Sequence, residues 1–261
     1  MKTYLELQEG VYDPNIFKAF FLAGGPGSGK SYVARRTTGG TGLKSVNSDD
    51  AFEHMLKKAG LSLKMPERET VPRDVVRDKA KIITTKTADN YIEGRLGLII
   101  DGTGRDAERI LGQKARLDEL GYDTYMIFVN TSLDVALQRN AERPRSIQEP
   151  IVVKSWKDVQ SNIGKFSNMF RQGFIVVDNN DAGEDIFKEV YKRVKGMLRR
   201  KVTNTRAKNW MSMELAKKAS GTKAKLGKGR LSGQGKQKID PKRAREIAKG
   251  GFVSWARQKG R

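Results

Sequence analysis

A glycine-rich segment at residues 24–31 is the clearest chemical signal in this chain. Its sequence, GGPGSGKS, fits the pattern G-x-x-x-x-G-K-[ST]. In this pattern glycines turn successive backbone N–H groups toward phosphate oxygens, the lysine reaches the β- and γ-phosphates, and the hydroxyl binds Mg²⁺. We therefore predict a nucleoside triphosphate site that takes ATP and Mg²⁺. The residues assigned to it are Gly25, Gly27, Ser28, Gly29, Lys30, Ser31 and Tyr32.

Two adjacent carboxylates, Asp49 and Asp50, follow a short apolar segment. Phosphoryl transfer to a hydroxyl requires a carboxylate that accepts the hydroxyl proton. Aspartate is also a good helix N-cap. We expect one member of the pair to cap the next helix and the other to act as the base. The residues alone favour neither.

A second apolar segment ends at Asp101 and continues as Gly-Thr103-Gly-Arg105. An aspartate at this position often holds Mg²⁺ through water in phosphate-loop proteins. We predict that Asp101 serves the metal, together with Ser31, and that Asp101, Thr103 and Arg105 contact the substrate. The alternative is an ordinary strand-to-helix turn in which Asp101 is a structural cap.

Arginines cluster at residues 139–145. Arg139 and Arg143 are four residues apart, which places them on one face of a helix. An arginine here would stabilise the charge on a transferring phosphoryl group, so Lys30, Asp49, Asp50, Arg139 and Arg143 form the predicted catalytic set. Solvated arginines near a helix C-terminus are the alternative, because the helix dipole favours them there.

The elements that must position these residues alternate between strand and helix. Apolar runs predict strands at 17–23, 43–47, 96–100, 122–129 and 174–177. Helical periodicity predicts helices at 30–36, 51–59, 74–95, 107–120, 132–143, 150–170 and 184–198. Such alternation favours an α/β fold of three layers, α/β/α, around a parallel sheet. Ligands bind such sheets at the carboxyl ends of the strands, where the candidate residues lie.

Residues 16–180 resemble phosphate-loop kinases of the zeta-toxin and polynucleotide-kinase group. Residues 20–31, FFLAGGPGSGKS, are similar to both branches, whereas 100–105 (IDGTGR) and 120–124 (LGYDT) resemble zeta toxins. The segments 47–50 (NSDD) and 138–143 (QRNAER) resemble polynucleotide kinases. The resemblance implies a five-stranded parallel sheet of the nucleoside-kinase type.

The resemblance also implies roles for residues. The polynucleotide-kinase pattern makes Asp49 the base and Arg143 the arginine of the lid, while the zeta-toxin pattern places the base at Asp50. Phe52 stands where polynucleotide kinases carry an arginine, and Asp101 where zeta toxins usually carry glutamate. The implied acceptor is therefore left open between a nucleic-acid 5′-hydroxyl and a nucleotide or nucleotide sugar. Zeta toxins also have inhibitory protein partners.

Positive charge is concentrated at the C-terminal end of the sequence. The chain has 261 residues and a net charge of +21, and residues 201–261 hold 18 Lys and Arg against 3 Asp and Glu. We predict a kinase domain over residues 1–200 and a basic, partly helical extension over 201–261, with helices at 205–219 and 242–249. The extension is expected to contact nucleic acid, through residues such as Trp210, Lys242, Arg243 and Trp255.

Alternatives for the extension are a solubilising segment or a segment that binds an acidic protein. A second functional hypothesis makes nucleic-acid binding the main role, with the phosphate loop as an ATP-binding or ATPase module. Composition excludes several classes of site. The chain has no Cys, which excludes a thiolate nucleophile and a zinc site with Cys ligands. It has one His, His54, so a Ser-His-Asp triad would have to use that residue. Without a membrane-length apolar run or signal-like N-terminus, we expect a cytoplasmic protein without membrane contact.

Overall fold

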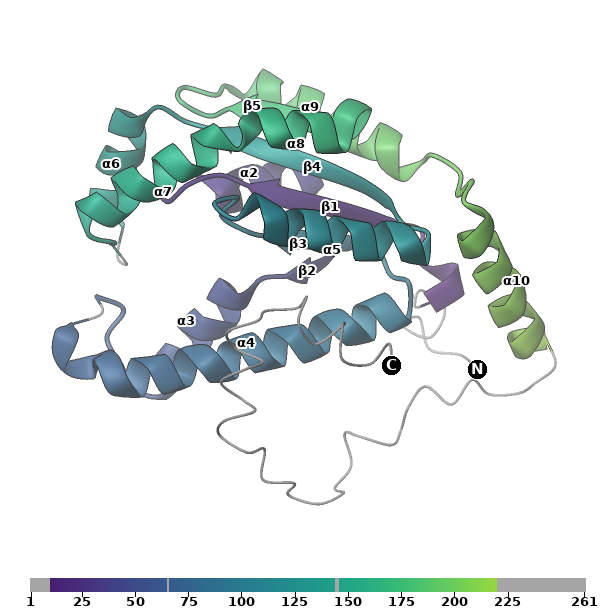
Figure 1. Ribbon diagram of the computed structural model, residues 1–261, viewed down its shortest axis with the longest axis horizontal. Coiled ribbons are helices and arrows are strands. Elements are labelled where there is room, and N and C mark those ends of the chain that lie inside the picture. Colours follow the sequence, from purple (N-terminus) through teal and green to yellow (C-terminus); the bar gives the residue numbers. More distant parts are fainter. Residues whose placement is uncertain (1–9, 65, 144–145, 220–261) are drawn as a thin grey trace, which may run out of the picture.

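Five strands form one parallel sheet (Figure 1) in the computed structural model, which describes residues 10–64, 66–143 and 146–219. The strand order is β2-β3-β1-β4-β5, and every neighbouring pair is parallel. This confirms the predicted five-stranded sheet of a nucleoside-kinase-like α/β fold. The strands are β1 (Lys18–Ala23), β2 (Lys44–Val46), β3 (Leu98–Asp101), β4 (Asp123–Asn130) and β5 (Phe174–Asp178).

Helices cover both faces of the sheet. All six residues of β1 are buried, because alternate side chains enter two different cores. Phe20 and Leu22 pack with α2 (Lys30–Thr38) and α9 (Glu184–Leu198). Phe21 faces the opposite side, where α5 (Ala107–Leu120) and α8 (Ile163–Phe170) pack. The remaining helices are α3 (Ser48–Lys58), α4 (Thr70–Glu93), α6 (Leu133–Ala141), α7 (Glu149–Ser161) and α10 (Thr205–Ala219), with single turns η1 (Gly10–Tyr12), η2 (Glu67–Glu69) and η3 (Arg171–Gly173).

Helices α3 and α4 form a unit with a small core of its own. Its buried residues are Phe52, Leu56, Val76 and Ala80. The unit connects β2 to β3, and Figure 1 shows it projecting from the β2 edge of the sheet. Helix α3 begins directly after β2, so the unit borders the carboxyl ends of the strands, where the candidate residues that follow β2 and β3 lie.

The helix expected over 150–170 is instead two helices, α7 and α8, which meet at Asn162. The Asn162 side chain donates to the carbonyls of Gly104 (3.1 Å) and Arg105 (2.8 Å). Helical periodicity in the sequence cannot reveal this break, because the hydrogen-bond partners of Asn162 lie on a turn 57 residues or more away in sequence.

Helix α10 packs against the sheet-bearing body, so packing continues beyond the boundary expected at residue 200. Ala207 is fully buried, and the Trp210 ring meets the Phe17 ring edge-on at 5.6 Å. Gly121, at φ 98°, lets the helix approach, since a Cβ there would lie 3.0 Å from the Ala207 Cβ. Trp210, expected to contact nucleic acid, thus lies beside the core. Lys242, Arg243, Trp255 and the helix expected at 242–249 are outside the described residues.

Within the part of the chain that the structure describes, no helix combines the length and apolar character needed to cross a bilayer.

Candidate active site

The glycine-rich loop connects β1 to α2 as the sequence predicts. Gly27 and Gly29 adopt φ values of 77° and 80°, in the left-handed region that favours glycine. A Cβ at Gly27 would lie 2.1 Å from the Ala136 carbonyl oxygen, and one at Gly29 would lie 2.4 Å from Asn179 Nδ2. Both positions therefore need glycine for conformation and for space.

Side chains from two other strand ends hold this loop in shape. Asn179 Nδ2 donates to the Ser28 carbonyl at 2.8 Å, and Thr131 Oγ1 donates to the same oxygen at 3.2 Å. The Ser28 hydroxyl is buried and has no hydrogen-bond partner among the described residues. A buried hydroxyl without a partner costs free energy, and an anionic oxygen entering the loop would satisfy it. The loop is thus preformed and fits a phosphate group.

Lys30 and Asp101 lie beside the loop with opposed pKa shifts. Burial lowers the pKa of Lys30; the charges of Asp101 and Asp49 act to raise it, and that of Arg143 lowers it further. Burial raises the pKa of Asp101, Lys30 opposes this shift, and Asp49 and Asp50 add to it. The predicted residues from the loop, from the ends of β2 and β3, and from the end of α6 therefore interact at one edge of the sheet.

Asn47, rather than either aspartate, caps α3. Its Oδ1 accepts from the Asp49 backbone N–H at 2.8 Å, and its Nδ2 donates to Asp101 Oδ2 at 3.2 Å. The expected capping role of Asp49 or Asp50 is therefore wrong, because the helix begins three residues earlier, at Ser48. Both aspartates are exposed in its first turn, where the helix dipole favours negative charge.

The turn after β3 is fastened to the phosphate loop. The Gly24 backbone N–H donates to the Thr103 carbonyl at 3.0 Å, and the side chains of Thr103 and Arg105 are exposed. Asp106 caps α5 by accepting from the Arg109 backbone N–H at 2.9 Å. Asp101 therefore does not cap this helix, and its carboxylate remains at the candidate site.

The two candidate arginines of α6 occupy different surroundings. Arg139 donates from Nη1 to the Asn179 carbonyl at 2.7 Å and from Nη2 to the Asn180 carbonyl at 2.8 Å. It therefore braces the turn after β5, which in turn holds the phosphate loop. Arg143 is exposed beyond the end of α6, close enough for its charge to influence Lys30. The Arg139 guanidinium is thus bonded to backbone carbonyls, whereas that of Arg143 is exposed.

Ser31 and Tyr32 diverge in the first turn of α2. Ser31 is exposed beside the loop. The Tyr32 ring instead packs edge-on against Phe187 of α9 at 5.4 Å, with the Arg35 guanidinium 6.0 Å from its centre. The structure therefore places the Tyr32 ring on the α2–α9 contact and not within the loop.

Three asparagines that the sequence did not identify as candidates form hydrogen bonds at this site. Asn47 and Asn179 each directly follow a strand, and that position was a usable signal. Asn140, inside α6, had no such signal. Its side chain is buried and binds both backbone groups of Ile147, at 2.7 Å to the carbonyl and 3.1 Å from the N–H. This clamp closes the loop that carries Arg143.

The oxygen donors at the loop suit a magnesium ion. Mg²⁺ prefers hard oxygen ligands and usually takes few from the protein, keeping waters and substrate phosphates. The Ser31 hydroxyl and the Asp101 carboxylate provide such donors. These few oxygen donors fit a metal that is bound jointly with phosphates. Among the described residues there is no group of three or more His, Cys, Asp or Glu that could hold a metal.

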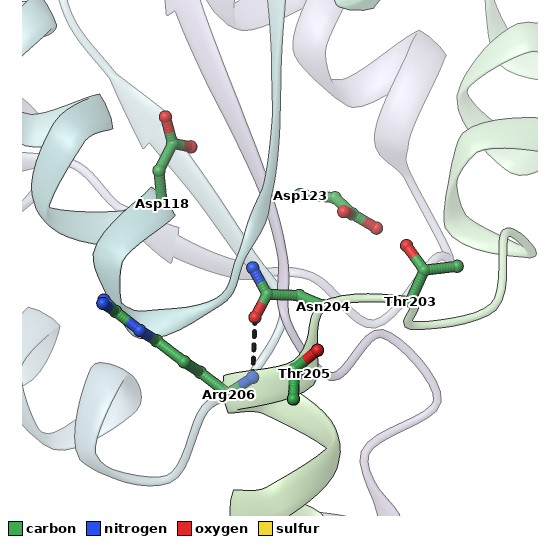
Figure 2. A pocket seen from close by; sticks show the side chains of 6 residues that line it. All are labelled: Asp118, Asp123, Thr203, Asn204, Thr205 and Arg206. Carbon is green, nitrogen blue, oxygen red and sulfur yellow. Dashed lines mark hydrogen bonds between the residues drawn. The ribbon is translucent and has the colours of Figure 1, made fainter.

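Two cavities among the described residues lie away from this edge. Figure 2 shows one of about 480 Å³ at the start of α10, where Asn204 Oδ1 accepts from the Arg206 backbone N–H. Its two carboxylates are already engaged: Asp118 with Lys114 and Thr124, and Asp123 with Lys18. The charge coupling and the loop geometry, rather than cavity size, therefore locate the site. The lining residues are Asp118, Asp123, Thr203, Asn204, Thr205 and Arg206.

The model of a family described as an AAA domain matches residues 20–165. A cytidylate kinase of Methanothrix thermoacetophila is 33% identical over 134 residues, which are 50% of this chain and 66% of the relative. This chain thus spans about two thirds of that relative's length.

Two solved structures are also similar. A shikimate kinase from Acinetobacter baumannii is 16% identical, with a TM-score of 0.42, over 73% of this chain and 99% of that one. A gluconokinase from Sinorhizobium meliloti 1021 is 12% identical, with a TM-score of 0.41, over 80% of this chain and 99% of that one.

Proposed function

The chain belongs to the AAA-domain family, and from this premise we propose that it transfers the γ-phosphoryl group of ATP to an acceptor hydroxyl. The observation that carries the proposal is the charge coupling of Lys30, Asp101, Asp49 and Arg143 around a preformed phosphate loop. Phosphoryl transfer is catalysed mainly by positioning and electrostatic stabilisation. Each of these side chains can contribute to one of those effects.

The loop and Lys30 hold the nucleotide. The backbone N–H groups of the loop and the N-terminus of α2 favour bound phosphates. Burial lowers the pKa of Lys30, and the negative charge of a bound triphosphate favours its protonated form. Mg²⁺, held through Ser31 and through water to Asp101, would neutralise charge on the phosphates. Arg143 faces the same charge from the lid loop.

Asp49 is the proposed base. It couples to both Lys30 and Asp101, and the Asn47 side chain joins its backbone N–H to the Asp101 carboxylate. The acceptor oxygen forms a bond to the γ-phosphorus, the bond to the bridging oxygen of ADP breaks, and the hydroxyl proton passes to Asp49. Arg143 stabilises the charge on the transferring group.

The α3–α4 unit provides a candidate acceptor contact. The Arg77 guanidinium lies 4.6 Å from the centre of the Phe52 ring. Phe52 stands where polynucleotide kinases carry an arginine, and α4 brings an arginine to that place from elsewhere in the chain. A stacked guanidinium retains N–H groups for an anion. We therefore propose that the acceptor carries a phosphate as well as a hydroxyl, as nucleic-acid ends, nucleotides and nucleotide sugars do.

The test is transfer of label from γ-labelled ATP with Mg²⁺. The acceptor panel contains 5′-hydroxyl DNA and RNA, nucleoside monophosphates including CMP, and UDP-N-acetylglucosamine. We expect transfer to one acceptor class, with a loss of about 10²-fold or more in Asp49→Asn and a smaller loss in Asp50→Asn. Lys30→Ala is the inactive control.

Different outcomes would change different parts of the proposal. A larger loss in Asp50→Asn would assign the base to Asp50. Label on the phosphate of CMP would replace the hydroxyl acceptor with a phosphate acceptor. If the protein binds ATP but transfers label to no acceptor, whether or not it hydrolyses ATP, the proposed kinase activity is contradicted. That result would favour the second candidate function, a nucleic-acid-binding protein with an ATP module. The sequence observation that favours this candidate is the basic extension beyond residue 219.

A further inference from the structure

Positive charge begins on the folded body and not in the C-terminal extension. Residues 1–187 hold 27 Lys and Arg against 26 Asp and Glu, whereas residues 188–261 hold 24 against 4. The change occurs within α9, a helix packed on the sheet through Phe187, Val190 and Val194. The basic region therefore includes an ordered surface whose shape is set by the fold.

Four cations of α9 form a row along its outward face. Lys188, Lys192, Lys195 and Arg199 follow the spacing i, i+4, i+7 and i+11, which places them on one side of a helix. All four are exposed. At 1.5 Å per residue the row is roughly 16 Å long. Figure 1 shows α9 lying along the sheet, with its C-terminal end leading toward α10.

The row lacks the acidic residues that an ordinary solvated helix face carries. Lys188 pairs with Asp185 at 3.0 Å, but no Asp or Glu occurs from residue 190 to residue 213. Within the described ranges, Lys192 and Arg199 make no ion pair, and Lys195 lies 5.2 Å from the centre of the Tyr191 ring. Lys192, Lys195 and Arg199 thus present cations that no carboxylate of the described residues pairs with.

We propose that this α9 row binds the phosphate backbone of a nucleic acid. A nucleic-acid strand carries one phosphate per roughly 3.4 Å of duplex axis, so the row spans about five phosphates of one strand. A helix fixed on the sheet presents its cations in a preorganised line, which reduces the ordering cost of binding. The inference is independent of phosphoryl transfer, since none of these residues is at the candidate active site.

The test measures binding of the full-length chain to a fluorescent duplex DNA of about 20 base pairs as salt is varied. In the triple variant Lys192→Gln/Lys195→Gln/Arg199→Gln, the slope of log K against log salt should become shallower by about 2.7, because each lost phosphate contact contributes about 0.9. Binding at about 0.1 M salt should weaken on the order of 100-fold. The matched control neutralises three exposed lysines elsewhere, Lys154→Gln/Lys157→Gln/Lys165→Gln.

The control variant should change the slope by less than about 1. Equal slopes in the triple variant and the wild type, or equal changes in both triples, would overturn the proposal. Binding to phosphatidylserine vesicles without binding to DNA would also overturn it and assign the row to a membrane surface. Thermal unfolding checks that each variant is folded, and single substitutions such as Lys192→Gln, each expected to change the slope by about 0.9, repeat the test with less perturbation.

Discussion

The two edges of the sheet carry two lysines in contrasting surroundings. At the amino edge, Lys18 begins β1, is buried, and pairs with Asp123. At the carboxyl edge, Lys30 begins α2, and burial lowers its pKa despite the charge of Asp101. One lysine has a directly bonded partner within the chain, whereas the other faces a loop shaped for phosphate.

This difference separates stability from function within one sheet. At the amino edge the buried charge is paired within the chain, and the Phe17 and Trp210 rings meet edge-on, which favours the folded state. At the carboxyl edge the chain keeps a desolvated ammonium, a carboxyl with a raised pKa and the orphaned Ser28 hydroxyl. Such groups are typical of functional sites, where a ligand supplies the missing interactions.

The largest expected effect comes from exchanging the two lysines for methionine. Lys30→Met should reduce phosphoryl transfer by about 10³-fold, because a cation at the phosphates is lost. Its unfolding free energy should not fall, since a desolvated charge is removed. Lys18→Met should show the reverse. Phosphoryl transfer per folded molecule should be near normal, and the unfolding free energy should fall by up to about 3 kcal/mol, because Asp123 is left without its partner. Urea unfolding and transfer assays on both variants test this; loss of transfer in Lys18→Met without unfolding would contradict the comparison.

A smaller effect is expected at the amino edge from Trp210→Ala. This change removes the edge-on contact with Phe17 and the contact with the Arg95 guanidinium, 5.6 Å from the ring. Because the ring is only partly buried, we expect the unfolding free energy to fall by about 2 kcal/mol, which is less than the usual cost of truncating a fully buried tryptophan. Thermal unfolding measures it, with Met213→Ala on the exposed side of α10 as the control. Equal destabilisation by the two changes would show that α10 does not stabilise the body through this ring.

The smallest expected effect is a pH dependence at the carboxyl edge. Burial raises the pKa of Asp101 above its usual 3.8, so the folded state holds this proton to higher pH than the unfolded state does. Stability from this group is therefore present at low pH and is lost as the pH rises from about 3.8 through the raised pKa. Asp101→Asn removes this dependence, and its unfolding free energy relative to the wild type should increase between about pH 4 and pH 7. Urea unfolding measures this difference. If the unfolding free energies of Asp101→Asn and the wild type differ by the same amount at every pH, the pKa of Asp101 is not raised.

Local sequence determined the phosphate loop and the strands that lead to the site. The helices expected at 107–120, 184–198 and 205–219 match α5, α9 and α10, because apolar periodicity is a local signal, to which Gly121 adds a stop after α5. The loop glycines likewise follow from backbone conformation within a few residues. The placement of Asp101 and Asp49 at one edge follows from parallel strands, which end on the same side.

Tertiary structure alone decided which side chains meet. Asn179 reaches Ser28 across 151 residues, Arg139 reaches the turn after β5 across 40, and α10 covers the amino edge through Trp210. The Asn47 side chain that caps α3 also reaches Asp101, 54 residues away in sequence. Hydrogen bonds and packing between distant segments have no period or spacing in the sequence, because they arise only when the sheet brings its strand ends together.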